Sequence, residues 1–194
     1  MGGDCLNTGC VPSKTLLRSA SVNHLISRGE EFGLKEASAT PDFKAVMNRV
    51  HETIATIAPH DSRERYTSLG VDCVEGEATI TSPYHVKVND RVITTRNIVI
   101  ATGAKPFVPN IPGLEDVGFY TSDTIWSLEA LPKQMLVAGG GPIGCELAQA
   151  FSRLGSKVSI IERGERLLPK EDPEVSAVIE QYFRDEGIQV LTGH

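Results

Sequence analysis

Residues 135–144 read Met-Leu-Val-Ala-Gly-Gly-Gly-Pro-Ile-Gly, so an apolar run passes directly into the spacing Gly-x-Gly-x-x-Gly. A short apolar run bounded by glycines predicts a buried strand that ends in a tight turn. The next residues predict a helix, because their apolar side chains recur on one stripe. This stripe comprises Leu147, Ala148, Phe151 and Leu154. A second apolar run follows at residues 158–161 and ends at Glu162, so we expect a strand–helix–strand unit.

The glycines of this unit have the spacing of a dinucleotide-binding loop. Gly139 would make the tight turn, Gly141 would let the backbone approach a pyrophosphate, and Gly144 would allow close packing of helix on strand. The start of the helix would face the phosphates with the positive end of its dipole. The loop is completed by Gly140, Pro142 and Ile143. The pattern predicts a Rossmann-type dinucleotide site, and a purely structural glycine turn is the alternative.

The end of the second strand indicates which dinucleotide this unit would bind. Glu162 lies 23 positions after Gly139, where a carboxylate can accept hydrogen bonds from ribose hydroxyls and would repel a 2′-phosphate. Arg163 and Arg166 follow and could attract such a phosphate. Because the carboxylate occupies the position at the strand end, we expect NAD, with NADP as the less favoured cofactor.

A second motif lies at the start of the chain, where residues 2–14 read Gly-Gly-Asp-Cys-Leu-Asn-Thr-Gly-Cys-Val-Pro-Ser-Lys. Cys5 and Cys10 lie at the start of a predicted helix, where free backbone N–H groups and the helix dipole favour thiolate over thiol. Gly9 gives the backbone freedom to bring the two cysteines together, and Pro12 is tolerated in a first helical turn. A reversible disulfide is therefore expected.

Three other roles are open to this cysteine pair. A zinc site needs a second Cys or His pair, which Cys73 and Cys145 do not provide, so we expect no metal. A structural disulfide of a secreted protein is disfavoured, because four cysteines in 194 residues without a signal-like start indicate a reducing, cytoplasmic location. Two buried, inert cysteines remain the third alternative.

The run from Gly2 to Lys14 resembles the redox-active disulfide motif of the pyridine nucleotide-disulfide oxidoreductases, flavoproteins that include dihydrolipoamide dehydrogenase, mercuric reductase and glutathione reductase. The resemblance implies that Cys5 exchanges with substrate and that Cys10 lies against FAD as a charge-transfer thiolate. Lys14 would lie beside the flavin ring, with Gly3 and Asp4 in the same cofactor-binding segment. Asp4 replaces the usual Thr, and its carboxylate should raise the pKa of the neighbouring thiol.

The same resemblance assigns roles to residues elsewhere in the chain. Glu146 would pair with Lys14 across the flavin, so that the two form an ion pair linking both motifs. The segment 97–103 resembles a family segment that passes close to FAD, which implies cofactor contacts from Ala101, Thr102 and Gly103. Ala78 would contact the flavin adenine through its backbone. Without the family, Ala78 would be an ordinary strand alanine.

These observations predict an α/β fold with two incomplete domains. Residues 1–113 would form part of an FAD-binding domain of helices plus a β-meander, and residues 114–194 part of a Rossmann-type NAD-binding domain. We expect one helix from the cysteine motif to about Arg28 and another that starts at Pro41-Asp42 and is kinked or ended by Pro59. Further expected elements are strands at residues 71–74, 78–80, 85–88, 92–94 and 97–103, and a helical segment at 120–131.

The resemblance covers essentially the whole chain but only the middle of a family member. We therefore expect an internal fragment of an FAD-dependent enzyme that passes electrons from NAD(P)H to the cysteine pair and on to a thiol, disulfide or metal-ion substrate. The fragment alone would be inactive, and the intact protein a homodimer. A non-catalytic nucleotide-binding or interaction module is the alternative. The net charge of −6 argues against nucleic acid, and no apolar stretch is long enough to cross a membrane.

Overall fold

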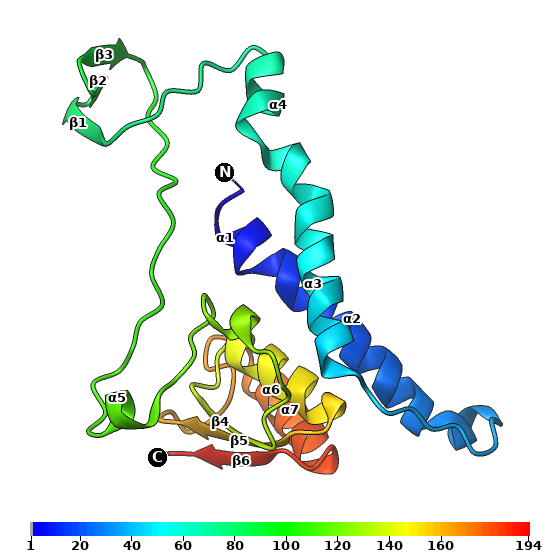
Figure 1. Ribbon diagram of the computed structural model, residues 1–194. Helices are drawn as coiled ribbons and strands as arrows, with labels where there is room; N and C mark the ends of the chain where they lie inside the picture. The colour runs from blue at the N-terminus through cyan, green and yellow to red at the C-terminus, as the bar shows by residue number, and fades with distance from the viewer. Residues whose placement is uncertain (1) are drawn as a thin grey trace.

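We describe residues 2–194 of the chain from a computed structural model (Figure 1). Two long helices lie beside a compact unit of parallel strands and helices, and a small antiparallel sheet lies apart from both. The fold is of the α/β class, as the sequence predicts. No helix among residues 2–194 is both long and apolar enough to span a membrane.

The C-terminal unit has the predicted strand–helix–strand arrangement. Its elements are β4 (Gln134–Ala138), α6 (Pro142–Leu154), β5 (Lys157–Glu162), α7 (Pro173–Asp185) and β6 (Gln189–Thr192). The strands are parallel in the order β4-β5-β6, with Val137 opposite Ile160 and Ile160 opposite Val190. Pro142 opens α6 at a first-turn position, where its missing N–H costs no intrahelical hydrogen bond.

The first motif forms two helices rather than one. α1 (Gly3–Asn7) carries Cys5, and α2 (Cys10–Ser27) begins at the second cysteine and ends one residue before the predicted limit at Arg28. α3 (Phe43–Ile57) follows the predicted bounds, and the side chain of Asp42 caps it by accepting a 3.1 Å hydrogen bond from the Ala45 amide. The remaining helical segments in the first half are η1 (Gly29–Phe32), η2 (Ala58–Asp61) and α4 (Arg63–Ser68).

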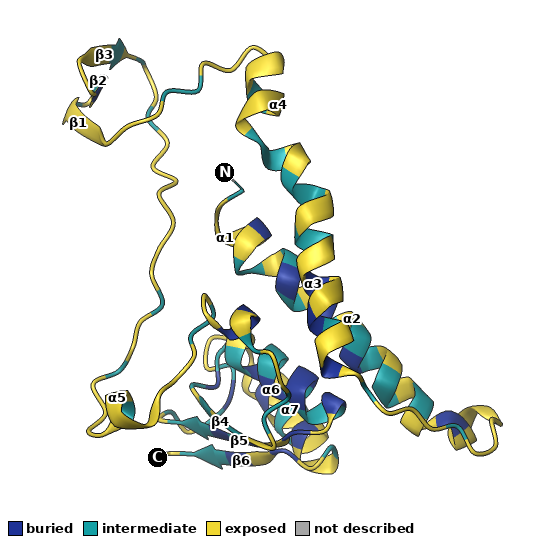
Figure 2. Ribbon diagram, in the orientation of Figure 1, coloured by how far each residue is buried: buried dark blue, intermediate teal, exposed yellow. Residues whose placement is uncertain are grey.

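One hydrophobic core joins the two halves of the chain. Leu16 and Ala20 of α2 and Val50 of α3 are buried in the same cluster as Ala148 and Phe151 of α6. The rings of Phe43 and Phe151 lie with their centroids 5.9 Å apart. Figure 2 shows buried residues in α2, α3 and α6, on the sides where these helices pack. Burial of this shared core fixes α2 and α6 against each other.

Three expectations about strands and helices are wrong. Residues 71–74 form no strand, so the meander consists of β1 (Ala78–Ser82), β2 (His85–Val88) and β3 (Arg91–Thr94) in antiparallel order. The segment 97–103 is not a buried strand, and Val99 is 86% exposed. A buried strand needs neighbouring strands to pair its backbone, and none of the described strands pairs with this segment.

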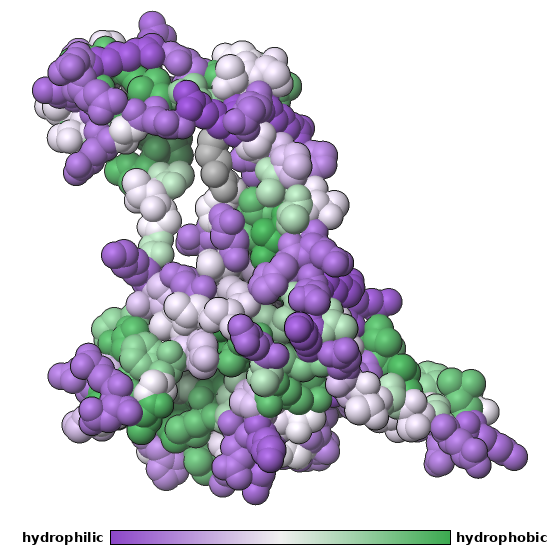
Figure 3. Space-filling view, viewed as in Figure 1, coloured by the Kyte–Doolittle hydropathy of each residue, from purple (hydrophilic) through white to green (hydrophobic). Residues whose placement is uncertain are grey.

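The predicted helical segment at 120–131 is reduced to the single turn η3 (Ile125–Ser127), preceded in the chain by the short α5 (Leu114–Val117). Hydrogen bonds between Thr121 and Thr124 form a local turn that replaces the first helical turn. Apolar side chains also remain on the surface of the C-terminal sheet, where Leu136 of β4 is 64% exposed. Figure 3 shows hydrophobic surface in the region of this sheet, on its lower side in that view.

Candidate functional site

The two cysteines of the first motif lie in contact at the junction of α1 and α2. Both are exposed free thiols, and the Cys5 side chain is hydrogen-bonded to Cys10. Gly9 allows this junction, because a Cβ atom at that position would lie only 2.8 Å from the carbonyl oxygen of Asp4. A neighbouring, exposed pair of thiols is the arrangement that a reversible disulfide needs.

Two opposing effects are expected at Cys5: a helix start that favours the thiolate, and an Asp4 carboxylate that raises the pKa of the thiol. The pKa is raised, but its causes begin with Cys10 and not with Asp4. The hydrogen bond to Cys10 is the main cause that raises the pKa of Cys5 above its ordinary value, followed by partial desolvation. Cys5 lies inside the short α1, whereas Cys10 begins α2. Stabilisation of a thiolate by a helix start therefore does not apply to Cys5, because the Cys10 thiol is the main influence on the pKa of Cys5.

Lys14 and Glu146 form the predicted ion pair. The Lys14 ammonium donates hydrogen bonds of 2.5 and 2.6 Å to the two carboxylate oxygens of Glu146. The side chains are 60% and 39% exposed, so the energetic contribution is that of a surface pair, up to about 1 kcal/mol. The ion pair matters mainly for the arrangement of the helices, because it joins α2, which begins at Cys10, to α6, which follows the glycine loop.

The glycine loop has the features that a bound pyrophosphate needs. Gly139 has a φ of 112°, which permits the tight turn at the end of β4. A Cβ atom at Gly144 would lie 2.1 Å from the Gly139 carbonyl oxygen, so α6 packs closely on this turn. A Cβ atom at Gly141 would meet nothing within 4 Å, and no side chain caps the start of α6. The loop therefore leaves open space at a helix N-terminus, which fits a dinucleotide phosphate.

The other residues of the loop differ in how far they are buried. Gly140 is buried against Leu167, whereas Ile143 is 61% exposed. Glu162 lies directly beside the loop: its carboxylate accepts hydrogen bonds of 2.6 Å from the Gly140 amide and 2.7 Å from the Gly164 amide. These two backbone donors hold the carboxylate of Glu162 at the end of β5, beside the glycine loop.

The residues expected to contact FAD are only partly brought together. Gly103 lies near Asp4, since a Cβ atom added there would be 3.3 Å from the Asp4 carboxylate. Ala101 and Thr102 precede it on the exposed segment, and Gly3 is the first residue of α1. Ala78, in contrast, lies in the separate sheet at the start of β1 and is exposed (Figure 1). Asp4 and Gly103 thus form one surface beside Cys5, a position that fits an extended cofactor, and Ala78 lies outside it.

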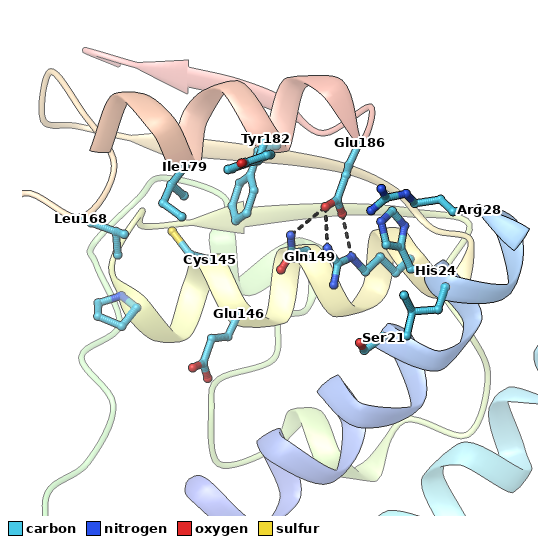
Figure 4. Close-up of a pocket in the computed structure, with 14 residues that line it drawn as sticks. Ser21, His24, Arg28, Cys145, Glu146, Gln149, Leu168, Ile179, Tyr182 and Glu186 are labelled. Atoms are coloured by element: carbon cyan, nitrogen blue, oxygen red, sulfur yellow. Dashed lines mark hydrogen bonds and ion pairs between the residues drawn. The ribbon is translucent and has the colours of Figure 1, made fainter. Parts of the chain in front are cut away.

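A cavity that the sequence did not predict lies between α2, α6 and α7. It has a volume of about 580 Å3 and is bordered by Pro142, Glu146 and Cys145. Figure 4 shows Glu186 of the loop after α7 reaching toward α6, where it accepts hydrogen bonds from Gln149 and Arg153. The Arg153 carbonyl in turn accepts a 2.6 Å hydrogen bond from Asn23 of α2. Partners so distant in the sequence leave no periodic pattern by which they could have been found.

Three comparisons with known proteins all find the same family of proteins. The family model described as "Pyridine nucleotide-disulphide oxidoreductase" matches residues 1–194. The mercuric reductase of Bacillus cereus is 38% identical over 197 residues, which cover 100% of this chain and 31% of that protein. The dihydrolipoyl dehydrogenase of Mycoplasma genitalium is 35% identical and matches 98% of this chain and 43% of its own length.

Among solved structures, the Cu(II) complex of the HOCl-induced flavoprotein disulfide reductase RclA from Escherichia coli superposes with a TM-score of 0.78 at 30% identity. The match covers 99% of this chain and 40% of that protein. The chain thus spans less than half the length of each of these relatives, and its match runs through nearly all of its own residues.

Proposed function

This chain belongs to the pyridine nucleotide-disulphide oxidoreductase family, and on that premise we propose that it is part of an FAD-dependent enzyme. The enzyme would take electrons from NAD(P)H, pass them to the Cys5 and Cys10 pair, and deliver them to a thiol, disulfide or metal-ion substrate. Residues 1–113 would belong to the FAD-binding domain and residues 114–194 to the NAD-binding domain.

The observation that carries this proposal is the ion pair between Lys14 and Glu146. It joins α2, which starts at Cys10, to α6, which starts at the glycine loop. A redox pair and a nucleotide loop placed on two helices of one rigid core are what electron transfer between a nicotinamide and a disulfide requires. FAD, when bound, would supply the two-electron relay between them. Lys14, Asp4 and Gly103 are the residues of this chain that would hold it.

The cysteines would perform thiol–disulfide exchange. The Cys5 thiol would lose its proton and attack one sulfur of a disulfide substrate, so that the other sulfur leaves as a thiolate and takes up a proton. Cys10 would then attack the Cys5 sulfur and release the second substrate thiol. The protein pair is oxidised to a disulfide by two electrons, and the substrate disulfide is reduced to two thiols. The closeness of Cys5 and Cys10 supports a dithiol–disulfide pair, and the assignment of the two roles follows the resemblance.

For the nicotinamide cofactor, we propose NAD over NADP. The carboxylate of Glu162, held by the Gly140 and Gly164 amides, supports this preference because it would repel a 2′-phosphate. The proposal extends to a cytoplasmic homodimer as the intact state, on the strength of the resemblance alone.

The 194-residue chain should be equilibrated in thiol–disulfide buffers of increasing potential, alkylated and analysed by peptide mass spectrometry. We expect the alkylated fractions of Cys5 and Cys10 to fall together as the buffer potential rises, with the slope of a two-electron couple. The buried Cys145 should stay a thiol and remain alkylated after unfolding. The Cys10→Ser variant should give only mixed disulfides at Cys5. If the pair stays reduced at every potential although NADH binds in a calorimetric titration, the chain is a nucleotide-binding module and the redox proposal is wrong.

A further inference from the structure

Trp126 of η3 contacts the short segment that connects the two cysteines. Its indole N–H donates a 3.1 Å hydrogen bond to the backbone carbonyl of Thr8, which lies between α1 and α2. The same N–H lies 2.8 Å from the Ser122 carbonyl of its own turn. Trp126 is buried in the core that joins the two halves of the chain. A core residue 118 positions away in the sequence is thus bonded to the segment between Cys5 and Cys10.

The Thr8 carbonyl depends on this donor. The next carbonyl, that of Gly9, accepts a 3.0 Å hydrogen bond from the Ser13 amide, four residues on. The same spacing would pair the Thr8 carbonyl with residue 12, but Pro12 has no N–H to donate. No backbone N–H of residues 2–194 donates to the Thr8 carbonyl. Removal of the indole N–H would therefore leave this partly buried carbonyl without a protein donor.

Trp126 is itself held in place from α3. The Nε2 atom of His51 lies 3.1 Å from the Trp126 carbonyl oxygen, and this ring nitrogen is the donor because a carbonyl oxygen can only accept. α3 also packs against α2 in the shared core. His51, Trp126 and Thr8 thus form a continuous path of hydrogen bonds from α3 to the segment between the cysteines.

We propose that Trp126 is a positioning residue for the redox pair formed by Cys5 and Cys10. This inference rests on the proposed function and adds a residue to its site. Thr8 is followed by Gly9, whose backbone has the greatest freedom in this segment. The hydrogen bond from Trp126 limits that freedom while both cysteines are thiols. Less conformational entropy is then lost when the disulfide closes, so the bond to Thr8 favours the disulfide over the dithiol.

The test measures the equilibrium between the cysteine pair and glutathione. The reduced 194-residue chain is equilibrated with mixtures of glutathione and glutathione disulfide, quenched with acid, alkylated and analysed by peptide mass spectrometry. Cys5 and Cys10 each lose one electron and one proton as their disulfide forms, and glutathione disulfide is reduced to two thiols. Trp126→Phe keeps an aromatic ring in the core and removes the N–H. We expect it to lower the equilibrium constant for oxidation about three- to tenfold, the factor that one hydrogen bond contributes.

Asn23→Leu is the matched control. The Asn23 side chain also donates to a distant backbone carbonyl, that of Arg153 at 2.6 Å, and joins α2 to α6. It lies roughly 20 Å along the helix axis from Cys10. Both substitutions remove one side-chain N–H donor and keep most of the side-chain volume, and urea unfolding measures what each costs in stability. Asn23→Leu should leave the oxidation constant of the cysteine pair unchanged.

His51→Leu is a second variant that leaves the core intact, because His51 is exposed. It should lower the oxidation constant less than Trp126→Phe does. In the double variant it should add nothing to the effect of Trp126→Phe, since His51 acts through Trp126. His51→Gln keeps a side-chain N–H donor and should retain more of the unsubstituted value than His51→Leu.

The outcomes separate the two proposals. An oxidation constant that Trp126→Phe leaves unchanged, or that Asn23→Leu lowers equally, would overturn the positioning role while the cysteine pair still oxidises. If Trp126→Phe does not fold, an unchanged constant in His51→Leu would overturn it instead. A pair that stays reduced at every glutathione ratio in the unsubstituted chain would overturn the proposed redox function and the positioning role with it.

Discussion

The carboxylate of Glu162 accepts a 2.6 Å hydrogen bond from the backbone amide of Gly140, which lies 22 residues earlier in the chain. The other carboxylate oxygen accepts from Gly164. One side chain therefore pairs two backbone donors and connects the end of β5 to the loop after β4. The residue expected to select the nucleotide is thus also part of the loop's structure.

Replacing Glu162 with Ala should destabilise the fold by about 1–3 kcal/mol, because the buried Gly140 amide loses its acceptor. Urea unfolding followed by circular dichroism measures the change. Glu165→Ala removes an exposed carboxylate three residues away and serves as the control, with an expected change below about 0.5 kcal/mol. Equal effects of the two substitutions would contradict this account.

Glu162→Arg should shift the ratio of affinities for NADH and NADPH toward NADPH by tenfold or more, since it exchanges a repelling carboxylate for a phosphate partner. Calorimetric titration of the variant with each cofactor gives the ratio directly. An unchanged ratio would mean that Arg163 or Arg166 contacts the ribose instead.

Two glycines of the loop should respond differently to alanine. Gly144→Ala places a Cβ atom against the Gly139 carbonyl oxygen and should cost at least about 2 kcal/mol of stability. Gly141→Ala meets no protein atom within 4 Å, so the fold should keep its stability while NADH affinity falls because the methyl group occupies the phosphate space. Thermal unfolding and NADH titration of both variants test this contrast, which a shared loss of stability would refute.

Cys10→Ala should lower the pKa of Cys5 toward its ordinary value, because it removes the hydrogen bond that is the main cause of the raised pKa. The alkylation rate of Cys5 by iodoacetamide, measured from pH 7 to 10 by peptide mass spectrometry, reports this pKa. In the unsubstituted chain the midpoint should lie at higher pH than in the variant. Coincident profiles would show that Cys10 does not control the Cys5 thiol.

The buried thiol of Cys145 should make stability depend on pH in the alkaline range. Burial, followed by the charge of Glu162, raises its pKa from 9.0 to about 11. The unfolded chain therefore loses this proton first, and the folded state loses stability as the pH rises from about 9 to about 11. Cys145→Ala should flatten this part of the urea-unfolding profile relative to the unsubstituted chain, since other alkaline groups titrate equally in both. Parallel profiles would contradict the burial effect.

Local patterns in the sequence determined a large part of this fold. The glycine spacing and apolar stripe predicted β4, α6 and β5, and Asp42 marked the start of α3, because these features depend on neighbours within a few residues. Cys10 was placed correctly at the start of a helix, whereas Cys5 lies inside the separate α1. The ion pair of Lys14 with Glu146 was predicted only through the family resemblance, since nothing local connects residues 132 positions apart.

Tertiary structure decided the rest. Residues 97–103 have the composition of a buried strand but are exposed, because a strand forms only where neighbours pair its backbone. The pKa of Cys5 depends on contact with Cys10, and Arg49 donates to the Thr15 carbonyl because α3 packs on α2. An apolar or charged pattern specifies which face of an element is buried, but the partner that covers it is chosen only when the whole chain packs.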